Sequence, residues 1–422
     1  MSKNQIISAI DIGSTKITTL IASIPEDLEK INIIGVSNEP SKGLRKSQIV
    51  DIDETIESIT QSVEAAERMA GYSISSSLAS ISGSHIESMN SKGVVAVADP
   101  EAEITANDVD RVIEAARAVS LPSAREVIHV IPRDFRVDSQ EGVKDPVGMS
   151  GVRLEAEAHI ITGSATAMRN IGKCVSEIGV EVDSLVFSGL ASAEAVLTPT
   201  EKELGVVLVD IGGGSTSLAI FVEGALSYSA VLPVGAKNIT NDLAIGLRVS
   251  LESAEKIKLG LSKAARKSED DSDELDVKKL GLSEEVGKLS KKTLTEGIIR
   301  PRINEVFSMI GEELKKSGFG GTTPAGVVVT GGGALTVGLE TSCKRSLSLP
   351  VRIGYPKGLS GLVDEIKSPA FAASWGLINY GVKNFKGIKS DSSFKAVGKV
   401  FSKIPVKGVI EKSVKLIKSF LP

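Results

Sequence analysis

One motif occurs twice in the sequence, and this repeat constrains the fold more than any other feature of the chain. The apolar run Gln5–Ile10 leads into Asp11-Ile12-Gly13-Ser14-Thr15-Lys16, after which a second apolar run begins. Gly205–Val209 leads in the same way into Asp210-Ile211-Gly212-Gly213-Gly214-Ser215-Thr216 and another apolar run. Each copy predicts two strands joined by a glycine-rich turn, which is a β-hairpin. Two such hairpins far apart in the chain predict a duplicated α/β fold with two related halves.

Segments between the hairpins have their own patterns. Apolar residues three and four apart predict helices over Asp53–Ala70, Ser164–Ile178 and Leu190–Leu197. The region from about 84 to 159 predicts a small β-α-β-β-β insert, whose helix begins at Thr105 or Asn107 and whose last three strands are Val127–Ile131, Phe135–Val137 and Val152–Ile160. Dense alternating charge over Lys263–Lys292 predicts a solvated loop rather than core. A third glycine motif, Gly331–Gly333, follows a short strand and should lead into a helix.

Composition excludes several classes of protein. Hydrophobic residues make up 41% and charged residues 24%, which argues against a disordered chain and an integral membrane protein. The polar start after Met1 predicts no signal peptide. With Cys174 and Cys343 far apart and only three histidines, we expect a reducing cytoplasm, no disulfide framework and no zinc site.

The glycine-rich turns carry the chemistry that the sequence predicts. Gly, Ser and Thr in a tight turn present backbone N–H groups and hydroxyls to phosphate oxygens. Asp11 and Asp210, at the strand ends, would hold water around Mg²⁺. Gly331–Gly333 resembles a platform on which adenine rests against bare backbone. No Gly-x-x-x-x-Gly-Lys-Ser/Thr motif occurs, so we expect ATP between two domains rather than in a P-loop.

The C-terminal segment is basic and amphipathic. Residues 383–422 carry ten Lys against Asp391 and Glu411, although the whole chain has a net charge of -4. This balance disfavours nucleic acid and favours an anionic membrane surface. The residues predicted to enter the membrane are Val409, Ile410, Val414, Ile417, Phe420 and Leu421. The alternatives are a helix packed on the protein itself or a coiled-coil arm. A second amphipathic segment, 394–404, has no role that the sequence assigns.

Four further runs show a resemblance to a known family. They are Gly142–Glu155, Leu190–Leu197, Val231–Gly235 and Asn241–Arg248. They are similar to bacterial FtsA cell-division proteins, within the actin/Hsp70/sugar-kinase superfamily, and the resemblance spans about residues 5–385. It implies the actin-like (ribonuclease H-like) duplicated α/β fold with the FtsA-type inserted subdomain, followed by a C-terminal amphipathic helix.

The resemblance also implies domain boundaries. They are 1–84 and 160–200 for subdomain 1A, 85–159 for the inserted subdomain 1C, 201–236 and 319–384 for subdomain 2A with its closing helix, 237–318 for subdomain 2B, 385–393 for a linker and 394–422 for the tail.

The resemblance implies a site role for each of these residues. The residues of the phosphate loops would be Asp11, Gly13, Ser14, Thr15, Lys16, Asp210, Gly212, Gly213, Gly214, Ser215 and Thr216. The residues of the ribose and adenine site would be Glu255, Lys258, Gly331, Gly332 and Gly333. Glu255 and Lys258 could instead be an exposed charge pair on a helix.

Two departures from the family pattern concern hydrolysis. Ser188-Gly189 stands where relatives usually have Glu-Pro, and Ser217 where an Asp commonly follows the second turn. A serine is a weak proton acceptor, so in-line attack by water should be poorly organised. The prediction is tight ATP binding with weak or absent turnover, and no residue is assigned a catalytic role.

The resemblance implies a peripheral protein on the cytoplasmic face of the membrane at the division site. Such a protein polymerises, tethers FtsZ through the FtsZ C-terminal peptide, and meets other division proteins through its insert. Arg300 and Arg302 fall near the FtsZ-binding position, or are solvated helix residues. A PilM-like role in type IV pilus assembly is the alternative within the fold, and the basic tail argues against it. A small-molecule kinase would not need that tail, and an Hsp70-type chaperone would need a further domain.

Overall fold

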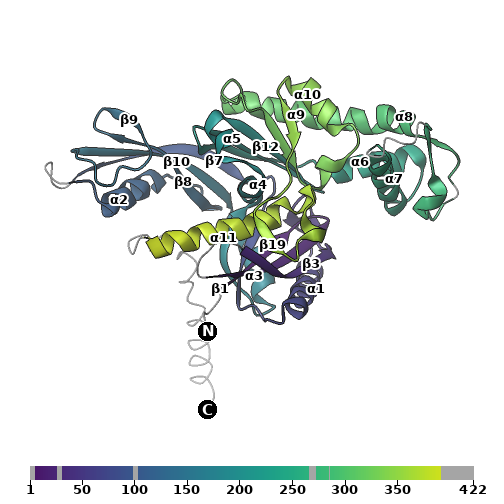
Figure 1. The fold of residues 1–422 in the computed structure, drawn as a ribbon, viewed down its shortest axis with the longest axis horizontal. Coiled ribbons are helices and arrows are strands. Elements are labelled where there is room, and N and C mark those ends of the chain that lie inside the picture. Colours follow the sequence, from purple (N-terminus) through teal and green to yellow (C-terminus); the bar gives the residue numbers. More distant parts are fainter. Residues whose placement is uncertain (1–4, 26–30, 98–102, 266–271, 285, 391–422) are drawn as a thin grey trace, which may run out of the picture.

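Two β-sheets of the same design form the centre of the protein (Figure 1). The computed structural model describes residues 5–25, 31–97, 103–265, 272–284 and 286–390, with side chains up to residue 383. In each half, three antiparallel strands follow one another, and parallel strands extend the sheet beyond the first of them. The duplicated α/β fold predicted from the repeated hairpin is therefore confirmed.

The first sheet has the strand order β11-β6-β1-β2-β3-β19. Its strands are β1 (Gln5–Ile12), β2 (Lys16–Ile24), β3 (Ile31–Pro40), β6 (Ser76–Ile81), β11 (Glu181–Phe187) and β19 (Leu359–Gly361). Helix α1 (Ile52–Ala70) packs on β2 and β3, and α3 (Ala165–Ser176) packs on β11. Asp51 begins α1 by accepting the Glu54 amide at 3.0 Å, and Gly71, at a φ of 63°, ends it.

The second sheet has the strand order β14-β13-β12-β17-β18. Its strands are β12 (Val206–Ile211), β13 (Thr216–Val222), β14 (Ala225–Leu232), β17 (Val327–Thr330) and β18 (Val351–Ile353). Helices α4 (Ser188–Val196), α5 (Pro199–Leu204) and α10 (Leu339–Leu347) flank it. After β17, the turn η3 (Gly332–Leu335) precedes α10, so the third glycine motif leads into a 3₁₀ turn before the expected helix.

The insert has the predicted β-α-β-β-β order. Its elements are β7 (Glu87–Ala96), α2 (Ala106–Arg117), β8 (Arg125–Val137), β9 (Gln140–Val143) and β10 (Arg153–Ser164). Thr105 begins α2, and its hydroxyl accepts the Asp108 amide at 3.4 Å. Two strands expected around residues 127–137 form the single strand β8, which is bulged where it pairs with β10. Val109, Val112 and Leu154 belong to a separate small core beneath this sheet.

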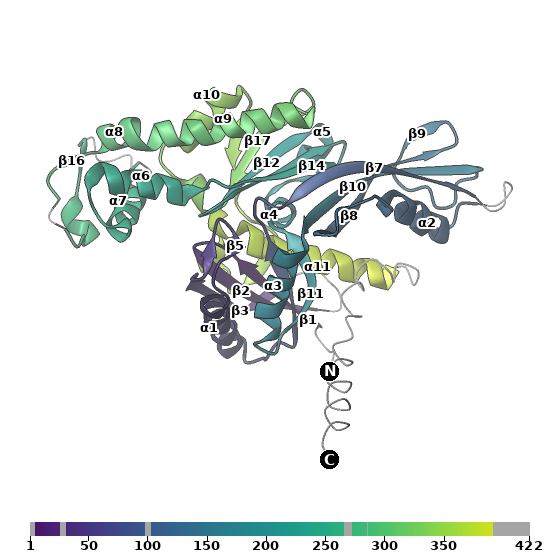
Figure 2. The same cartoon turned by 180° about the vertical axis from the view of Figure 1, so that it is seen from behind.

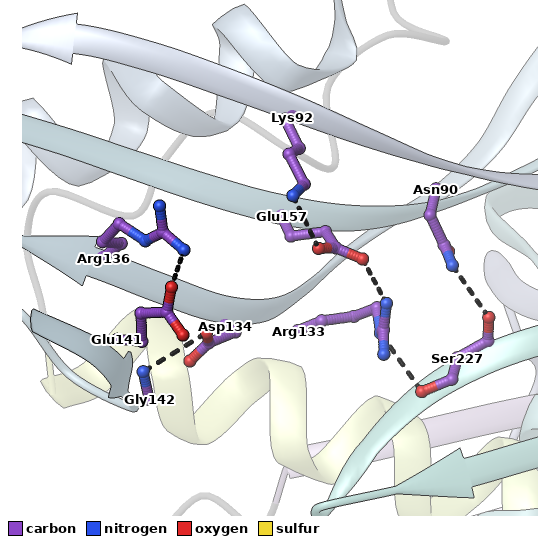
Figure 3. A network of polar contacts seen from close by, with 9 residues as sticks. All are labelled: Asn90, Lys92, Arg133, Asp134, Arg136, Glu141, Gly142, Glu157 and Ser227. Atoms are coloured by element: carbon purple, nitrogen blue, oxygen red, sulfur yellow. Dashed lines mark hydrogen bonds and ion pairs between the residues drawn. The ribbon is translucent and has the colours of Figure 1, made fainter. Parts of the chain in front are cut away.

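Polar side chains join the insert to β14 of the second sheet (Figure 3). Arg133 Nε donates to Ser227 Oγ at 3.1 Å and pairs with Glu157, while Asn90 Nδ2 donates to the Ser227 carbonyl at 3.2 Å. His159 lies between Asn90 Oδ1, at 2.6 Å from Nδ1, and Ser229 Oγ, at 3.0 Å from Nε2. Burial lowers the pKa of His159 to about 3, so the ring is neutral at this junction.

A helical lobe extends from the second sheet, at the end of the molecule opposite to the insert (Figure 1). Its elements are α6 (Ala236–Leu247), α7 (Leu251–Ala264), β15 (Glu274–Leu275), η1 (Val277–Leu280), β16 (Leu289–Ser290), α8 (Lys291–Leu294), the π-helical η2 (Thr295–Ile299) and α9 (Arg300–Ser317). The predicted solvated loop is wrong in part, because β15 pairs with β16 and buries Leu275 and Leu289 in the second core. Because charged residues surround these two leucines in the sequence, the pattern did not predict their burial.

Helix α11 (Ala372–Ser390) packs against α4 and against strands β1, β2 and β6 of the first sheet. The short turns η4 (Asp364–Ile366) and η5 (Pro369–Phe371) precede it. Because α11 continues to Ser390, most of the segment expected as a linker at 385–393 is helical. No proline interrupts this segment. Trp375, which is 2% exposed, anchors α11 by donating from Nε1 to the Lys357 carbonyl at 2.8 Å.

Gly376 allows α11 to touch α4. A Cβ at this position would lie 1.7 Å from the Ala191 carbonyl oxygen, so one of the two helices would have to move. We expect Gly376→Ala to lower the free energy of unfolding by about 3 kcal/mol, as measured by denaturant titration. Gly172→Ala is the matched control because a Cβ there meets nothing within 4 Å, and alanine favours a helix by up to about 1 kcal/mol. Equal effects of the two substitutions would contradict this account.

Candidate functional site

A cavity of about 710 Å³ lies between the two halves and brings the three glycine motifs together. The predicted residues that line it are Asp11, Gly13, Ser14, Thr15, Lys16, Asp210, Gly212, Gly213, Ser215, Glu255, Lys258, Gly331, Gly332 and Gly333. Both hairpin turns therefore face one space, as the sequence analysis expects.

Two predicted residues of the second turn do not line the cavity. Thr216 is buried, and its hydroxyl donates to the Val234 carbonyl at 2.8 Å. A Cβ on Gly214 would lie 2.7 Å from Ser14 Oγ and 3.0 Å from Lys46 Cα. Contrary to the prediction, these residues hold the shape of the turn and its contact with the first half.

The two turns share one backbone arrangement. The Gly13 amide donates to the Lys16 carbonyl at 3.1 Å, and the Gly212 amide donates to the Ser215 carbonyl at 2.9 Å. The turns also approach each other closely, because a Cβ on Gly213 would lie 2.3 Å from Thr15 Cγ2. Turns of this kind offer backbone amides and hydroxyls to an anion. Phosphate oxygens suit this part of the cavity.

Asp11 and Asp210 border the cavity at the ends of β1 and β12. Ser80 Oγ donates to Asp11 Oδ1 at 2.8 Å, and Ser192 Oγ donates to Asp210 Oδ2 at 2.5 Å. Burial raises the pKa of both carboxyls, that of Asp210 to about 6. A cation would stabilise the ionised pair. Since no group of three or more His, Cys, Asp or Glu could hold a metal in the described chain, water and phosphate would complete the shell of an ion such as Mg²⁺.

Two lysines bring positive charge to the same space. Burial lowers the pKa of Lys16 to about 8, although Asp11 and Asp210 favour its charged form, and its Nζ lies 3.0 Å from the centre of the Phe371 ring. Lys237, which the sequence pattern did not predict as a site residue, reaches across from the second half. Its Nζ donates to the Ser14 carbonyl at 2.6 Å, and burial lowers its pKa. An anionic ligand would stabilise both ammonium groups.

Glu255 and Lys258 form an ion pair on α7 in which the lysine is buried and the glutamate is partly exposed. Lys258 is 7% exposed, and its Nζ donates to Glu255 Oε2 at 2.7 Å and to Thr240 Oγ1 at 2.9 Å. The alternative of a solvated surface pair is therefore wrong for Lys258. Leu251 and Leu259, at 59% and 48% exposure, line the same wall and give it apolar surface. The sequence pattern around Leu251 and Leu259 did not indicate that they line a cavity.

Bare backbone is required at the third glycine motif. Gly331 has a φ of 83°, and a Cβ there would lie 2.2 Å from Asp210 Oδ1. A Cβ on Gly333 would lie 2.4 Å from Ile211 Cγ2. Gly332 is less constrained, since its nearest neighbour would be Ala370 Cβ at 3.7 Å. The motif therefore packs tightly on β12 while it borders the cavity.

The start of α4 presents hydroxyls to the cavity. Ser188 Oγ donates to the Ile81 carbonyl at 3.2 Å, and Ser217 Oγ lies 3.2 Å from Ser82 Oγ. Ser82, Ser188 and Ser217 all line the cavity. The carboxylate that borders this part of the wall is that of Asp210, which pairs with Ser217 across β12 and β13 and accepts from Ser192 of α4.

The predicted partner-binding arginines lie on α9, outside the cavity lining. Arg302 donates from Nε and Nη2 to the Asp242 carboxylate at 2.6 and 2.9 Å, which raises the pKa of the guanidinium. Arg300 pairs with Glu296. Arg302 is thus held by α6 rather than freely solvated.

The predicted membrane residues lie outside the described part of the chain. They are Val409, Ile410, Val414, Ile417, Phe420 and Leu421. Among the described residues, no helix has the length and apolar character needed to cross a bilayer.

Comparison with known proteins identifies the family. Residues 83–162 match the family model "SHS2 domain inserted in FTSA", and residues 207–376 match "Cell division protein FtsA". The chain is 39% identical over 383 residues to the cell division protein FtsA of Pseudomonas aeruginosa, with 91% of each chain covered. This chain belongs to the FtsA family. Its role is therefore in bacterial cell division.

Solved structures share the fold of this FtsA-family chain. A chain of the PilM-PilN type IV pilus biogenesis complex superposes with a TM-score of 0.62 and 15% identity, covering 89% of this chain and 98% of that one. MreB5 of Spiroplasma citri superposes with a TM-score of 0.56 and 14% identity, covering 92% and 99%. These likenesses confirm the actin-like fold. The PilM-like alternative has only this distant structural similarity behind it.

The raised pKa of Asp210 predicts how the stability of this FtsA-family protein depends on pH. Because the folded state favours the protonated carboxyl, protonation of Asp210 stabilises the folded protein. This contribution to the free energy of unfolding is fully present below the unfolded pKa of about 4 and is lost as pH rises through 6. Asp210→Asn should therefore exceed the wild type at pH 7.5, by up to about 3 kcal/mol in the free energy of unfolding, and match it near pH 4. Asp183→Asn, at an exposed position of β11, controls for the lost charge. A gap between Asp210→Asn and the wild type that does not change with pH would refute the assignment.

Proposed function

We propose that this protein binds Mg²⁺·ATP between its two halves, polymerises on the cytoplasmic membrane and tethers FtsZ filaments there during septum formation. The observation that carries the proposal is the meeting of two glycine-rich turns, with Asp11 and Asp210, in one cavity. Membership of the FtsA family supports the division-site part of the proposal.

The cavity provides for both ends of ATP. The turns at Ser14 and Ser215, with Lys16 and Lys237, suit the phosphates, and the carboxylates of Asp11 and Asp210 would hold Mg²⁺ through water. Bound Mg²⁺ would neutralise part of the phosphate charge. The MreB5 structure that shares this fold is described as bound to ADP, which supports an adenine nucleotide.

Two walls suit the adenosine. Glu255 can accept a hydrogen bond from a ribose hydroxyl, because its carboxylate is held at the cavity by Lys258 and Thr240. Leu251 and the bare backbone at Gly332 offer apolar contact to the flat base.

Hydrolysis should be slow, because Ser188 and Ser217 supply hydroxyls rather than proton acceptors for the attacking water, and the Asp210 carboxylate is already hydrogen-bonded to Ser192. We expect Mg²⁺·ATP to bind in titration calorimetry and phosphate release to stay far below the enzyme median of about 10 s⁻¹. Asp210→Ala should weaken Mg²⁺·ATP binding by about tenfold or more, while Asp183→Ala, on β11, should leave it unchanged. Circular dichroism checks that both variants fold. No Mg²⁺·ATP binding by the wild type would remove the proposal, and fast phosphate release would remove the claim of slow turnover.

The membrane part of the proposal is carried by the basic tail. Its apolar side chains, among them Ile410 and Ile417, would enter the interface while Lys412 and Lys415 meet anionic headgroups. One tail should bind reversibly, and many tails in a filament should bind by avidity.

Vesicle pelleting tests this part. The full chain should pellet with anionic phosphatidylglycerol vesicles, and the bound fraction should fall as salt rises. Ile410→Glu with Ile417→Glu should lose most of the binding, because charges would enter the apolar interface. Ser402→Glu with Ser419→Glu adds the same charge away from the predicted apolar face and should lose far less. Equal pelleting by the full chain and by a chain ending at Ser390 would contradict membrane targeting by the tail.

FtsZ tethering is proposed for the helical lobe. Arg302, fixed by Asp242, presents a preorganised guanidinium on α9, and Arg300 adds a second positive charge two residues before it. An acidic peptide end would suit this positively charged part of α9. Other division proteins would meet the insert at the opposite end of the molecule.

A further inference from the structure

A short hairpin places its turn against both phosphate-facing turns. Strands β4 (Leu44–Arg45) and β5 (Gln48–Ile49) are joined by Lys46 and Ser47. Figure 2 shows β5 on the side of the first half that faces the second half. Lys46 and Ser47 have φ values of 51° and 60°, where residues with a Cβ are strained. Surrounding contacts must therefore hold the turn in this conformation.

Ser47 supplies those contacts. Its amide donates to Ser14 Oγ at 2.7 Å, in the first phosphate-facing turn. Its hydroxyl lies 2.7 Å from Ser215 Oγ, in the second turn. Ser14 and Ser215 are 4% and 5% exposed, so both hydrogen bonds lie inside the protein, beside the cavity that these serines line. One residue thus connects the two halves at the cavity, which Ser47 also lines.

The hairpin fills the space where the turns meet. Gly214 has no side chain, and a Cβ there would lie 3.0 Å from Lys46 Cα. At its base the hairpin is closed, because the Val50 and Asp51 amides donate to the Gly43 carbonyl at 2.8 and 3.1 Å. Asp51 is also the N-cap of α1. The turn is thus anchored to α1 and is not a loose loop.

An entering polyphosphate must compete with this contact. The wall proposed for the base is formed by α7 and the third glycine motif, whereas the hydrogen bonds of Ser47 go to the two phosphate-facing turns. A phosphate that occupies the space between those turns must replace the Ser47–Ser215 contact with its own oxygens. In a nucleoside triphosphate, the terminal phosphate is the one that lies furthest from the base.

We infer that Ser47 is a ligand of the terminal phosphate and the residue that distinguishes ATP from ADP in this site. The inference rests on the proposed nucleotide binding. With ATP, the Ser47 hydroxyl donates to a γ-phosphate oxygen. With ADP, it keeps its hydrogen bond to Ser215. The position of the hairpin, and of α1 behind it, then depends on which nucleotide is bound.

Calorimetric titration of the full chain with Mg²⁺·ATP and with Mg²⁺·ADP tests this inference. Ser47→Ala should weaken ATP binding about tenfold or more, the loss of one hydrogen bond to a charged group, and change ADP binding by less than about twofold. Ser84→Ala is the matched control, because Ser84 accepts from Gln48 of the same hairpin at 3.4 Å and does not line the cavity. It should leave both affinities unchanged.

Two further variants separate the hydroxyl from the backbone strain. Ser47→Gly tolerates the positive φ and lacks the hydroxyl, so it should lose ATP selectivity as Ser47→Ala does, even if the alanine variant folds poorly. Lys46→Gly keeps the hydroxyl and should raise the Tm without changing the ratio of ATP to ADP affinity. An unchanged ratio in both Ser47 variants would overturn this inference alone. Absence of nucleotide binding by the wild type would overturn the proposed function with it.

Discussion

Backbone without side chains around the cavity is the constraint on which the rest of the structure depends. Gly213 lies against Thr15, Gly331 against Asp210 and Gly333 against Ile211, each with no room for a Cβ. These approaches bring the ends of β1, β12 and β17 around one cavity. A single added methyl group would push apart elements that the duplicated fold has to keep close.

Burial of charge at this meeting point explains why the cavity suits an ionic ligand. Asp11, Asp210 and Lys16 are withdrawn from water, and serine hydroxyls from β6 and α4 hold the two carboxylates in place. Without a ligand, the charged forms of these groups are less favourable than in water. Under the proposed function, a cation and a polyphosphate would restore the missing interactions, so the stability lost by burying these charges would be regained on binding.

Local patterns predicted the parts of the fold that depend on neighbours in the chain. The two hairpins, the β-α-β-β-β insert and α1 follow from alternation, spacing and capping residues such as Thr105. Ser47 and Lys237 were missed because their roles depend on contacts between distant segments, with Ser215 and Ser14 respectively. Tertiary packing likewise determines the burial of Leu275 and Leu289, which lie in a charged segment. It also determines the burial of Thr216, whose hydroxyl donates to a carbonyl inside the second half.

The hydrogen-bonded seam between the insert and β14 has a mechanical consequence. Along it, Arg133, Asn90 and His159 contact Ser227 and Ser229 through polar atoms. Water can substitute for such partners, and each bond has a net worth of about 1 kcal/mol. Beside these polar contacts, Ile161 of β10 belongs to the first core, and Ile128 and Ile131 of β8 pack against it. Apolar packing therefore holds the insert in place, and the polar seam sets its orientation.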